Sequence, residues 1–122
     1  MNSNDEFNGE EVRRIFPTPE FDQFYFSQPE RVQKKFDYVI NVMATVYNVS
    51  TKFVKHLKSS DLYEMRVSIG SNEYRTVLFS ADNPNFIEAK QSILLNGFLK
   101  KSDKDYEKEG EIAKKIVDRL KL

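Results

Sequence analysis

The stretch "LYEMRVSIGSNEYRTVLF", residues 62–79, constrains the fold of this chain more than any other part of it. Its first half alternates apolar and polar side chains, which is the period of a β-strand with one face against a core. The apolar face carries Met65, Val67 and Ile69, and the polar face carries Glu64, Arg66 and Ser68. The second half ends in a nearly continuous apolar run, typical of a central strand covered on both faces. We therefore expect a β-hairpin inside a sheet.

Three further segments predict additional strands. Residues 12–16, "VRRIF", form a short candidate strand that Pro17 ends. Residues 53–58, "FVKHLK", read as an extended arm before the hairpin, and residues 86–101 as a strand after it. With the hairpin, these segments predict a mostly antiparallel, twisted sheet of four to five strands.

Helix signals lie on both sides of the sheet segments. Thr18 followed by Pro19 predicts a helix start with a capping threonine and a first-turn proline. The segment 27–30, "SQPE", fits a capping box, and apolar residues at 3–4 spacing follow it over 32–47. A last helix is predicted over 103–122. The expected fold class is therefore α+β, with an N-terminal helical hairpin and a C-terminal helix packed on the sheet.

Composition narrows the class of protein. The chain has 122 residues, no cysteine and a single histidine, His56, so disulfides, thiolate metal sites and multi-histidine sites are excluded. We expect no metal and no cofactor. Residues 1–11 predict a flexible acidic tail, and residues 12–122 a single domain. No apolar run is long enough to cross a bilayer or to resemble a signal peptide, so we expect a cytoplasmic location without a membrane partner.

The net charge is zero, but its distribution is uneven. Residues 1–30 hold two arginines against seven acidic residues (2 − 7 = −5), and residues 31–101 hold eleven basic against six acidic residues (11 − 6 = +5). Residues 102–122 balance. A basic central segment is compatible with a polyanionic partner, although a mixed-charge surface that only keeps a small domain in solution is the simpler interpretation.

The two arginines of the hairpin raise a specific question. If the loop has two residues, residues whose numbers sum to 141 face each other, and Arg66 lies directly opposite Arg75. Like charges in that position destabilise a sheet. Two interpretations remain open: Glu64 or Glu73 neutralises the pair, or the pair binds phosphate.

Other cationic and aromatic side chains lie near the predicted sheet. The basic ones are Lys52, Lys55, His56, Lys58, Lys100 and Lys101. Together with the two arginines they could form a basic face that holds phosphates. Tyr63 and Tyr74 could stack on bases beside it, or could belong to the core. The sequence has no glycine-rich phosphate loop, and a lone histidine supports no Ser-His-Asp arrangement.

These features together resemble a known family, the HigB-like, phage Gp49-like branch of the RelE/ParE toxin superfamily. The resemblance covers about residues 20–120. Its most specific parts are "LYEMR" at 62–66, the Tyr74-Arg75 pair, and "GFLKK" at 97–101 before a Lys/Glu-rich helix. The segment "FVKHLKSSD", residues 53–61, fits the basic arm that precedes the hairpin.

The resemblance implies a RelE-like fold and the toxin of a type II toxin–antitoxin system. It further implies a ribosome-dependent, metal-independent mRNA endoribonuclease acting in the ribosomal A site. In that reaction the ribose 2′-OH attacks the adjacent phosphate, which requires a base, an acid for the leaving oxygen, and positive charge on the phosphorane. Arg66 and Arg75 are implied to bind the phosphate, since a guanidinium can hold two phosphate oxygens.

The remaining residues receive roles by the same resemblance. Lys100 and Lys101 occupy a position where relatives place catalytic or mRNA-contacting residues. His56 and Lys58 lie on the arm that supplies an acid–base residue, and the choice of general base among His56, Lys58, Lys100 and Lys101 stays open. Lys52, Lys55, Tyr63 and Tyr74 are expected to contact RNA.

The implied partners are a helix-turn-helix antitoxin, the ribosome with its mRNA, and operator DNA bound through the complex. Two alternatives differ in activity. A ParE-like protein would inhibit DNA gyrase without nuclease chemistry, and a catalytically degenerate module would only bind its antitoxin.

Overall fold

The computed structural model describes residues 10–58 and 60–121 and confirms the expected α+β class. Its elements, in chain order, are β1 (Arg14–Pro17), α1 (Pro19–Phe26), α2 (Glu30–Thr45), β2 (Val54–His56), β3 (Leu62–Ile69), β4 (Asn72–Ser80), β5 (Gln91–Leu99) and α3 (Asp103–Leu120). Residues 1–9 of the expected tail lie outside the described residues, whereas Glu10 and Glu11 are exposed.

The five strands form one sheet in the order β1-β5-β4-β3-β2. β4 occupies its centre, as the apolar run at its end predicts, and β1 and β2 lie at opposite edges. Three of the strand pairs are antiparallel, and β1 runs parallel to β5, so the sheet is mixed. A parallel pair requires a long crossover, which the chain between β1 and β5 supplies through the two helices and the other three strands.

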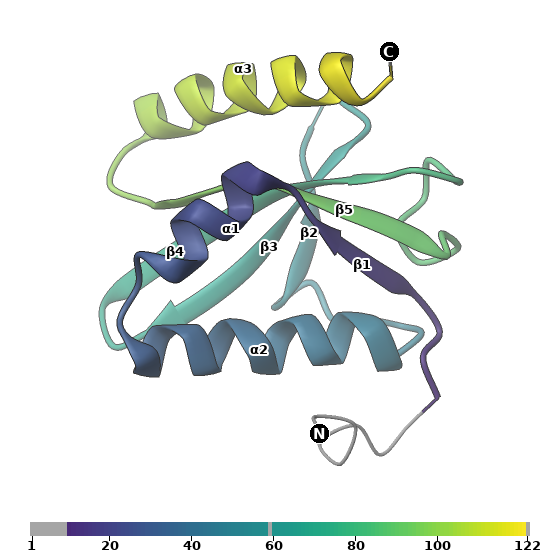
Figure 1. Ribbon diagram of the computed structural model, residues 1–122, viewed down its shortest axis with the longest axis horizontal. Coiled ribbons are helices and arrows are strands. Elements are labelled where there is room, and N and C mark those ends of the chain that lie inside the picture. The colour runs from purple at the N-terminus through teal and green to yellow at the C-terminus, as the bar shows by residue number, and fades with distance from the viewer. Residues whose placement is uncertain (1–9, 59, 122) are drawn as a thin grey trace.

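Helices cover both faces of the sheet, with α1 and α2 on one side and α3 on the other (Figure 1). The core beneath α1 and α2 includes Phe21, Val32, Phe36, Val39, Met43, Met65, Val67, Leu78 and Leu94. The core beneath α3 is smaller and consists of Leu62, Val77, Leu95, Phe98, Ala113, Ile116 and Val117. Since the sheet is apolar on both faces, every polar side chain that points from its centre needs a partner inside the protein.

The helix starts confirm one sequence prediction and correct another. Thr18 caps α1, because its hydroxyl oxygen accepts a hydrogen bond from the backbone N–H of Phe21 at 3.2 Å. The predicted capping box at Ser27 is wrong. Ser27 ends α1 and its hydroxyl donates to the carbonyl of Phe24 at 2.6 Å, so Pro29 precedes the first turn of α2 instead. The two helices lie too close in sequence for Ser27 to serve both.

The hairpin has a two-residue loop, Gly70-Ser71, so residues whose numbers sum to 141 do face each other. Gly70 takes a φ of +59°, the left-handed region that glycine adopts without strain. The following strand β5 is shorter than predicted, because residues 86–90 fold back before it begins. The Asp82 carboxylate accepts hydrogen bonds from the backbone N–H groups of Lys90 and Gln91, which holds this turn in place.

Arg13, just before β1, is fully buried and ties three segments together. Its guanidinium donates to four backbone carbonyl oxygens, those of Met43 (2.6 Å), Val46 (3.1 Å), Tyr47 (3.0 Å) and Ile87 (3.0 Å). The last carbonyls of α2 have no partner within the helix, and a cation there also complements the helix dipole. Burial lowers the pKa of the Arg13 guanidinium, which remains the charged donor of these bonds.

Gly97 in β5 allows α1 to lie directly on the sheet. A Cβ atom at this position would lie 2.3 Å from the ring of Phe24, which packs in turn against Phe36 and Tyr74. The close approach of α1 to β5 therefore depends on the missing side chain.

Within the described residues, no helix is both long enough and apolar enough to cross a membrane.

Replacing Arg13 by methionine is expected to lower the free energy of unfolding by about 2–4 kcal/mol, because four carbonyls lose their donor at a buried position. Chemical denaturation measures the change. Arg14→Met is the matched control, since Arg14 is exposed, and it should stay within about 0.5 kcal/mol of the wild type. Equal losses in the two variants would contradict the role assigned to Arg13.

Two glycine substitutions are expected to have opposite signs. Gly97→Ala should destabilise the protein by about 1–3 kcal/mol, because the Phe24 ring has to move. Gly110→Ala, in α3, has no atom within 4 Å of the added methyl group and should stabilise by about 0.5–1 kcal/mol through helix propensity. Thermal unfolding of both variants tests the pair, and a stabilised Gly97→Ala protein would refute the packing argument.

Candidate functional site

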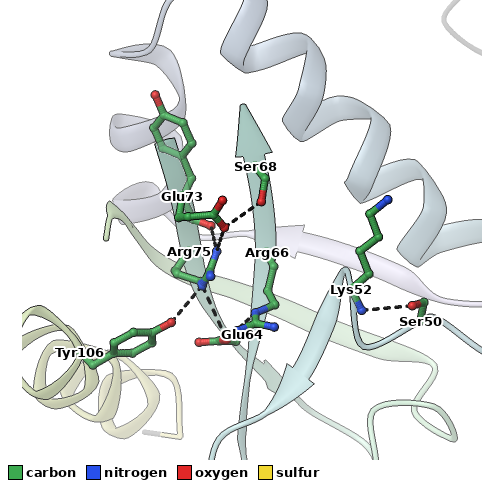
Figure 2. A network of polar contacts seen from close by, with 9 residues as sticks. Ser50, Lys52, Glu64, Arg66, Ser68, Glu73, Arg75 and Tyr106 are labelled. Atoms are coloured by element: carbon green, nitrogen blue, oxygen red, sulfur yellow. Dashed lines mark hydrogen bonds and ion pairs between the residues drawn. The ribbon is translucent and has the colours of Figure 1, made fainter. Parts of the chain in front are cut away.

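The candidate site is built on the face of the sheet that α3 covers. Arg66 of β3 lies directly opposite Arg75 of β4, as the two-residue loop predicts. Both side chains lie on this face: Arg75 contacts Tyr106 in the first half of α3 (Figure 2), and Arg66 lines a pocket with the same tyrosine. Two guanidinium groups therefore lie side by side on one face of the sheet.

Glutamates neutralise this pair, as the first of the two interpretations predicts. Glu64 Oε2 lies 2.8 Å from Arg66 Nε and 3.6 Å from Arg75 Nε, so one carboxylate serves both arginines. Glu73 Oε1 lies 3.2 Å from Arg75 Nη1 and accepts a second hydrogen bond from Ser68 at 2.7 Å. The Ser68 hydroxyl and then Arg75 lower the pKa of the Glu73 carboxyl, which keeps it ionised.

Arg75 is buried, and its Nε and Nη1 atoms are paired with protein groups. Besides the two carboxylates, its Nε donates to the Tyr106 hydroxyl at 2.9 Å and its Nη1 to the carbonyl of Tyr74 at 3.0 Å (Figure 2). Burial lowers the pKa of Arg75, but Tyr106 and the carboxylates outweigh that effect and raise it. Its side chain is 6% exposed, so Arg75 is less accessible to a substrate phosphate than Arg66.

Arg66 is the arginine that remains open to solvent. Its side chain is 28% exposed and lines a pocket of about 230 Å³ between β2, β3 and the start of α3. We call this the cationic pocket; its lining residues are Lys55, His56, Leu57, Lys58, Glu64, Arg66 and Tyr106. Three permanent cations and one carboxylate give it an excess of positive charge, which suits a phosphate.

Tyr106 is a site residue that the sequence did not indicate, and Glu64 is one of the two carboxylates that it did. Burial raises the pKa of the Tyr106 phenol, and the Glu64 carboxylate acts in the same direction against the Arg75 hydrogen bond. Tyr106 therefore keeps its proton at neutral pH and can donate it. Glu64 Oε1 is buried without a hydrogen-bond partner among the described residues, which is unusual for a carboxylate.

His56 lies at the edge of the cationic pocket, with its ring 4.8 Å from that of Tyr63. Its Nε2 lies 2.7 Å from the carbonyl oxygen of Ser60, and only an N–H can donate to that oxygen. Neutral His56 therefore carries its proton on Nε2 and leaves Nδ1 free to accept one.

Three predicted lysines do not line the cationic pocket. Lys100 directly follows the last residue of β5, and its Nζ lies 5.3 Å from the centre of the Tyr106 ring. Lys101 is exposed, and its backbone N–H donates to Asp105 at 2.9 Å. Lys52 lies apart from the network and points away from Arg66 (Figure 2).

Tyr63 and Tyr74 point to the opposite face of the sheet from the arginines. Tyr74 is buried with its ring 5.7 Å from that of Phe36, and Tyr63 packs on Phe86 at 5.8 Å. Tyr74 is therefore a core residue whose ring is not accessible to a base, which corrects its expected role in RNA binding. The alternative that these tyrosines belong to the core is the correct one for Tyr74.

The site has the groups for acid–base chemistry on a bound phosphate. Among the described residues, no three His, Asp or Glu side chains are grouped so that they could hold a metal ion. The available groups are a partly open guanidinium, lysines, a protonated phenol and an imidazole.

Comparison with known proteins supports the family indicated by the sequence. The family model described as phage derived protein Gp49-like (DUF891) matches residues 23–118, which is most of the chain. The search of curated proteins and the search of solved structures returned no match.

The neutralising role of Glu64 can be measured directly. Glu64→Gln is expected to lower the free energy of unfolding by roughly 2–3 kcal/mol, because two opposed guanidinium groups lose their shared buried charge. Adding Arg66→Gln should recover part of that loss in a double-mutant cycle. Glu73→Gln is the control and should cost less than about 1 kcal/mol, since Glu73 is 40% exposed. Equal costs for the two carboxylates would contradict this assignment.

Proposed function

The chain belongs to the phage-derived Gp49-like family, within the RelE/ParE-like toxin superfamily, and from this we propose that it is a toxin that cleaves mRNA on the ribosome. A toxin of a type II system implies a cognate antitoxin partner. The observation that carries the proposal is the cationic pocket, in which Arg66 is open to solvent next to a protonated Tyr106.

The proposed reaction is attack of a ribose 2′-OH on the adjacent phosphate. The O2′–P bond forms and the P–O5′ bond breaks, which gives a 2′,3′-cyclic phosphate and a 5′-OH. One proton leaves the 2′-OH and one must reach the departing O5′, so the reaction needs a base and an acid but no oxidant or reductant.

Arg66 is proposed to hold the phosphate and the negative charge of the phosphorane, with Lys55 and Lys58 from the neighbouring arm. The ion pair with Glu64 fixes the guanidinium in place, which reduces the reorganisation needed when the substrate binds. A substrate phosphate would compete with Glu64 only for part of the guanidinium, because Arg66 has further donors.

Tyr106 is proposed to donate the proton to O5′, and the free Nδ1 of His56 to accept the proton of the 2′-OH. The pKa of Tyr106 is raised by burial, so the phenol is in the required form at neutral pH. Arg75 holds the Tyr106 hydroxyl at 2.9 Å and acts through it. Among the four candidate bases, His56 and Lys58 line the pocket, and His56 offers an unprotonated ring nitrogen.

Inducible expression followed by mapping of mRNA 5′ ends tests this function. The wild type should arrest growth and produce new 5′ ends within codons only while ribosomes translate. Arg66→Ala and Tyr106→Phe should each reduce cleavage by about 100-fold or more, the usual effect of losing one transition-state contact. Arg31→Ala, an exposed arginine on α2, is the charge-matched control and should cleave like the wild type.

The outcomes separate the proposal from its alternatives. Circular dichroism and thermal unfolding first establish that each variant is folded. Growth arrest with intact mRNA would overturn the nuclease and favour the gyrase-inhibiting activity. A harmless wild type would leave only the antitoxin-binding module, and cuts that persist without translation would overturn the A-site mechanism.

A further inference from the structure

An apolar groove of about 150 Å³ lies at the edge of the sheet farthest from the cationic pocket. It runs between β1, α1 and α2, which lie side by side in Figure 1. Its walls are mainly the side chains of Ile15, Phe21, Tyr25, Phe26 and Ile40. The groove is therefore lined by aromatic and aliphatic groups, which is the usual chemistry of a protein-binding groove.

A large aromatic side chain of the groove lies open to solvent. Phe26, at the end of α1, is 70% exposed. Its ring meets the Tyr25 ring edge-on, at 5.0 Å between centres. Aromatic residues are enriched at the centres of protein interfaces, and an exposed one at an apolar groove marks such a surface.

The charged side chains that line the groove are both acidic. Asp22 and Asp37 are among its lining residues, and no lysine or arginine is. Within the described part of the chain, neither carboxylate forms an ion pair. An occupant that complements both features carries apolar side chains flanked by lysine or arginine.

The edge strand limits how that occupant can bind. β1 has a neighbour on one side only, but Pro17 has no N–H to offer on the open side, and the strand is four residues long. Addition of a further strand would gain few hydrogen bonds. Insertion of side chains from an amphipathic helix into the groove is the mode that the surface favours.

We propose that this groove is the docking site of the antitoxin, and that it receives an amphipathic helix with basic flanks. The proposal rests on the proposed function, since it requires a type II toxin. The cationic pocket is built on β2, β3 and α3, whereas the groove is built on β1, α1 and α2.

Binding to the small protein encoded beside the gene of this chain tests the docking site. Phe26→Lys should raise its Kd by about thirtyfold or more in calorimetry, because a central aromatic contact is replaced by a charge of the same sign as the partner. Tyr38→Lys is the matched control. Tyr38 is an aromatic residue of α2, 53% exposed, that packs toward Phe53 and lies outside the groove, and its variant should bind within about twofold of the wild type.

A second variant tests the charge of the groove. Asp22→Asn should raise the Kd by about threefold at low salt and by less at high salt, because screening weakens the pair it removes. In cells, Phe26→Lys should stay toxic when the antitoxin is co-expressed, whereas wild type and Tyr38→Lys should be neutralised.

Several outcomes would overturn the docking site. They are an unchanged Kd for Phe26→Lys, no complex with the neighbouring gene product, or self-association that Phe26→Lys abolishes while antitoxin binding stays intact. The last result would assign the groove to a second copy of this chain. Failure of the proposed nuclease is a separate result, because mRNA cleavage by the free wild type is measured without the antitoxin.

Discussion

The pairing register of β3 with β4 is the constraint on which the rest of the structure depends. It places Met65 and Val67 in the core beneath α2 and sends Glu64, Arg66 and Arg75 to the face beneath α3. A slip of β3 by one residue relative to β4 would turn Arg66 toward the core beneath α2 and turn Met65 and Val67 toward the face beneath α3. With the register fixed, two cations face each other, and the fold needs a buried carboxylate between them. The hairpin, the ion-pair network and the pocket are consequences of the same alignment.

The two arginines of this network differ in their exposure and in their partners. Arg75 is enclosed by Glu73, Glu64 and Tyr106, so it holds other groups in place. Arg66 shares Glu64 but keeps part of its guanidinium toward solvent. A stability device and a ligand-binding group thus occupy facing positions on adjacent strands. The sheet order then separates the cationic pocket from the apolar groove, since the two surfaces are built on opposite edges.

The sequence predicted most elements because their signals are local. The alternation over 62–69, the Thr18-Pro19 start and the apolar spacing of α2 depend on neighbours within a few residues. The errors have a different origin. Ser27 fits a capping box in the sequence, but in the structure it is the residue that ends α1. Residues 86–90 have the pattern of a strand, but the Asp82 carboxylate accepts hydrogen bonds from the backbone N–H groups of residues 90 and 91 and holds a turn there. The role of Tyr106 depends on Arg75, 31 residues away in the sequence, so no local pattern indicates it.

The class of fold, the hairpin and the residues that could carry charge at the site follow from the sequence alone, because side-chain period and turn chemistry are local properties. The register followed only on the condition of a two-residue loop, which the structure supplies. Which of the two arginines is exposed to solvent depends on the tertiary structure. The packing of α3 on the sheet encloses Arg75, brings Tyr106 to it and leaves Arg66 at the pocket, while the packing of α2 buries Tyr74. Burial and pairing depend on contacts between distant segments, and no local pattern in the chain encodes them.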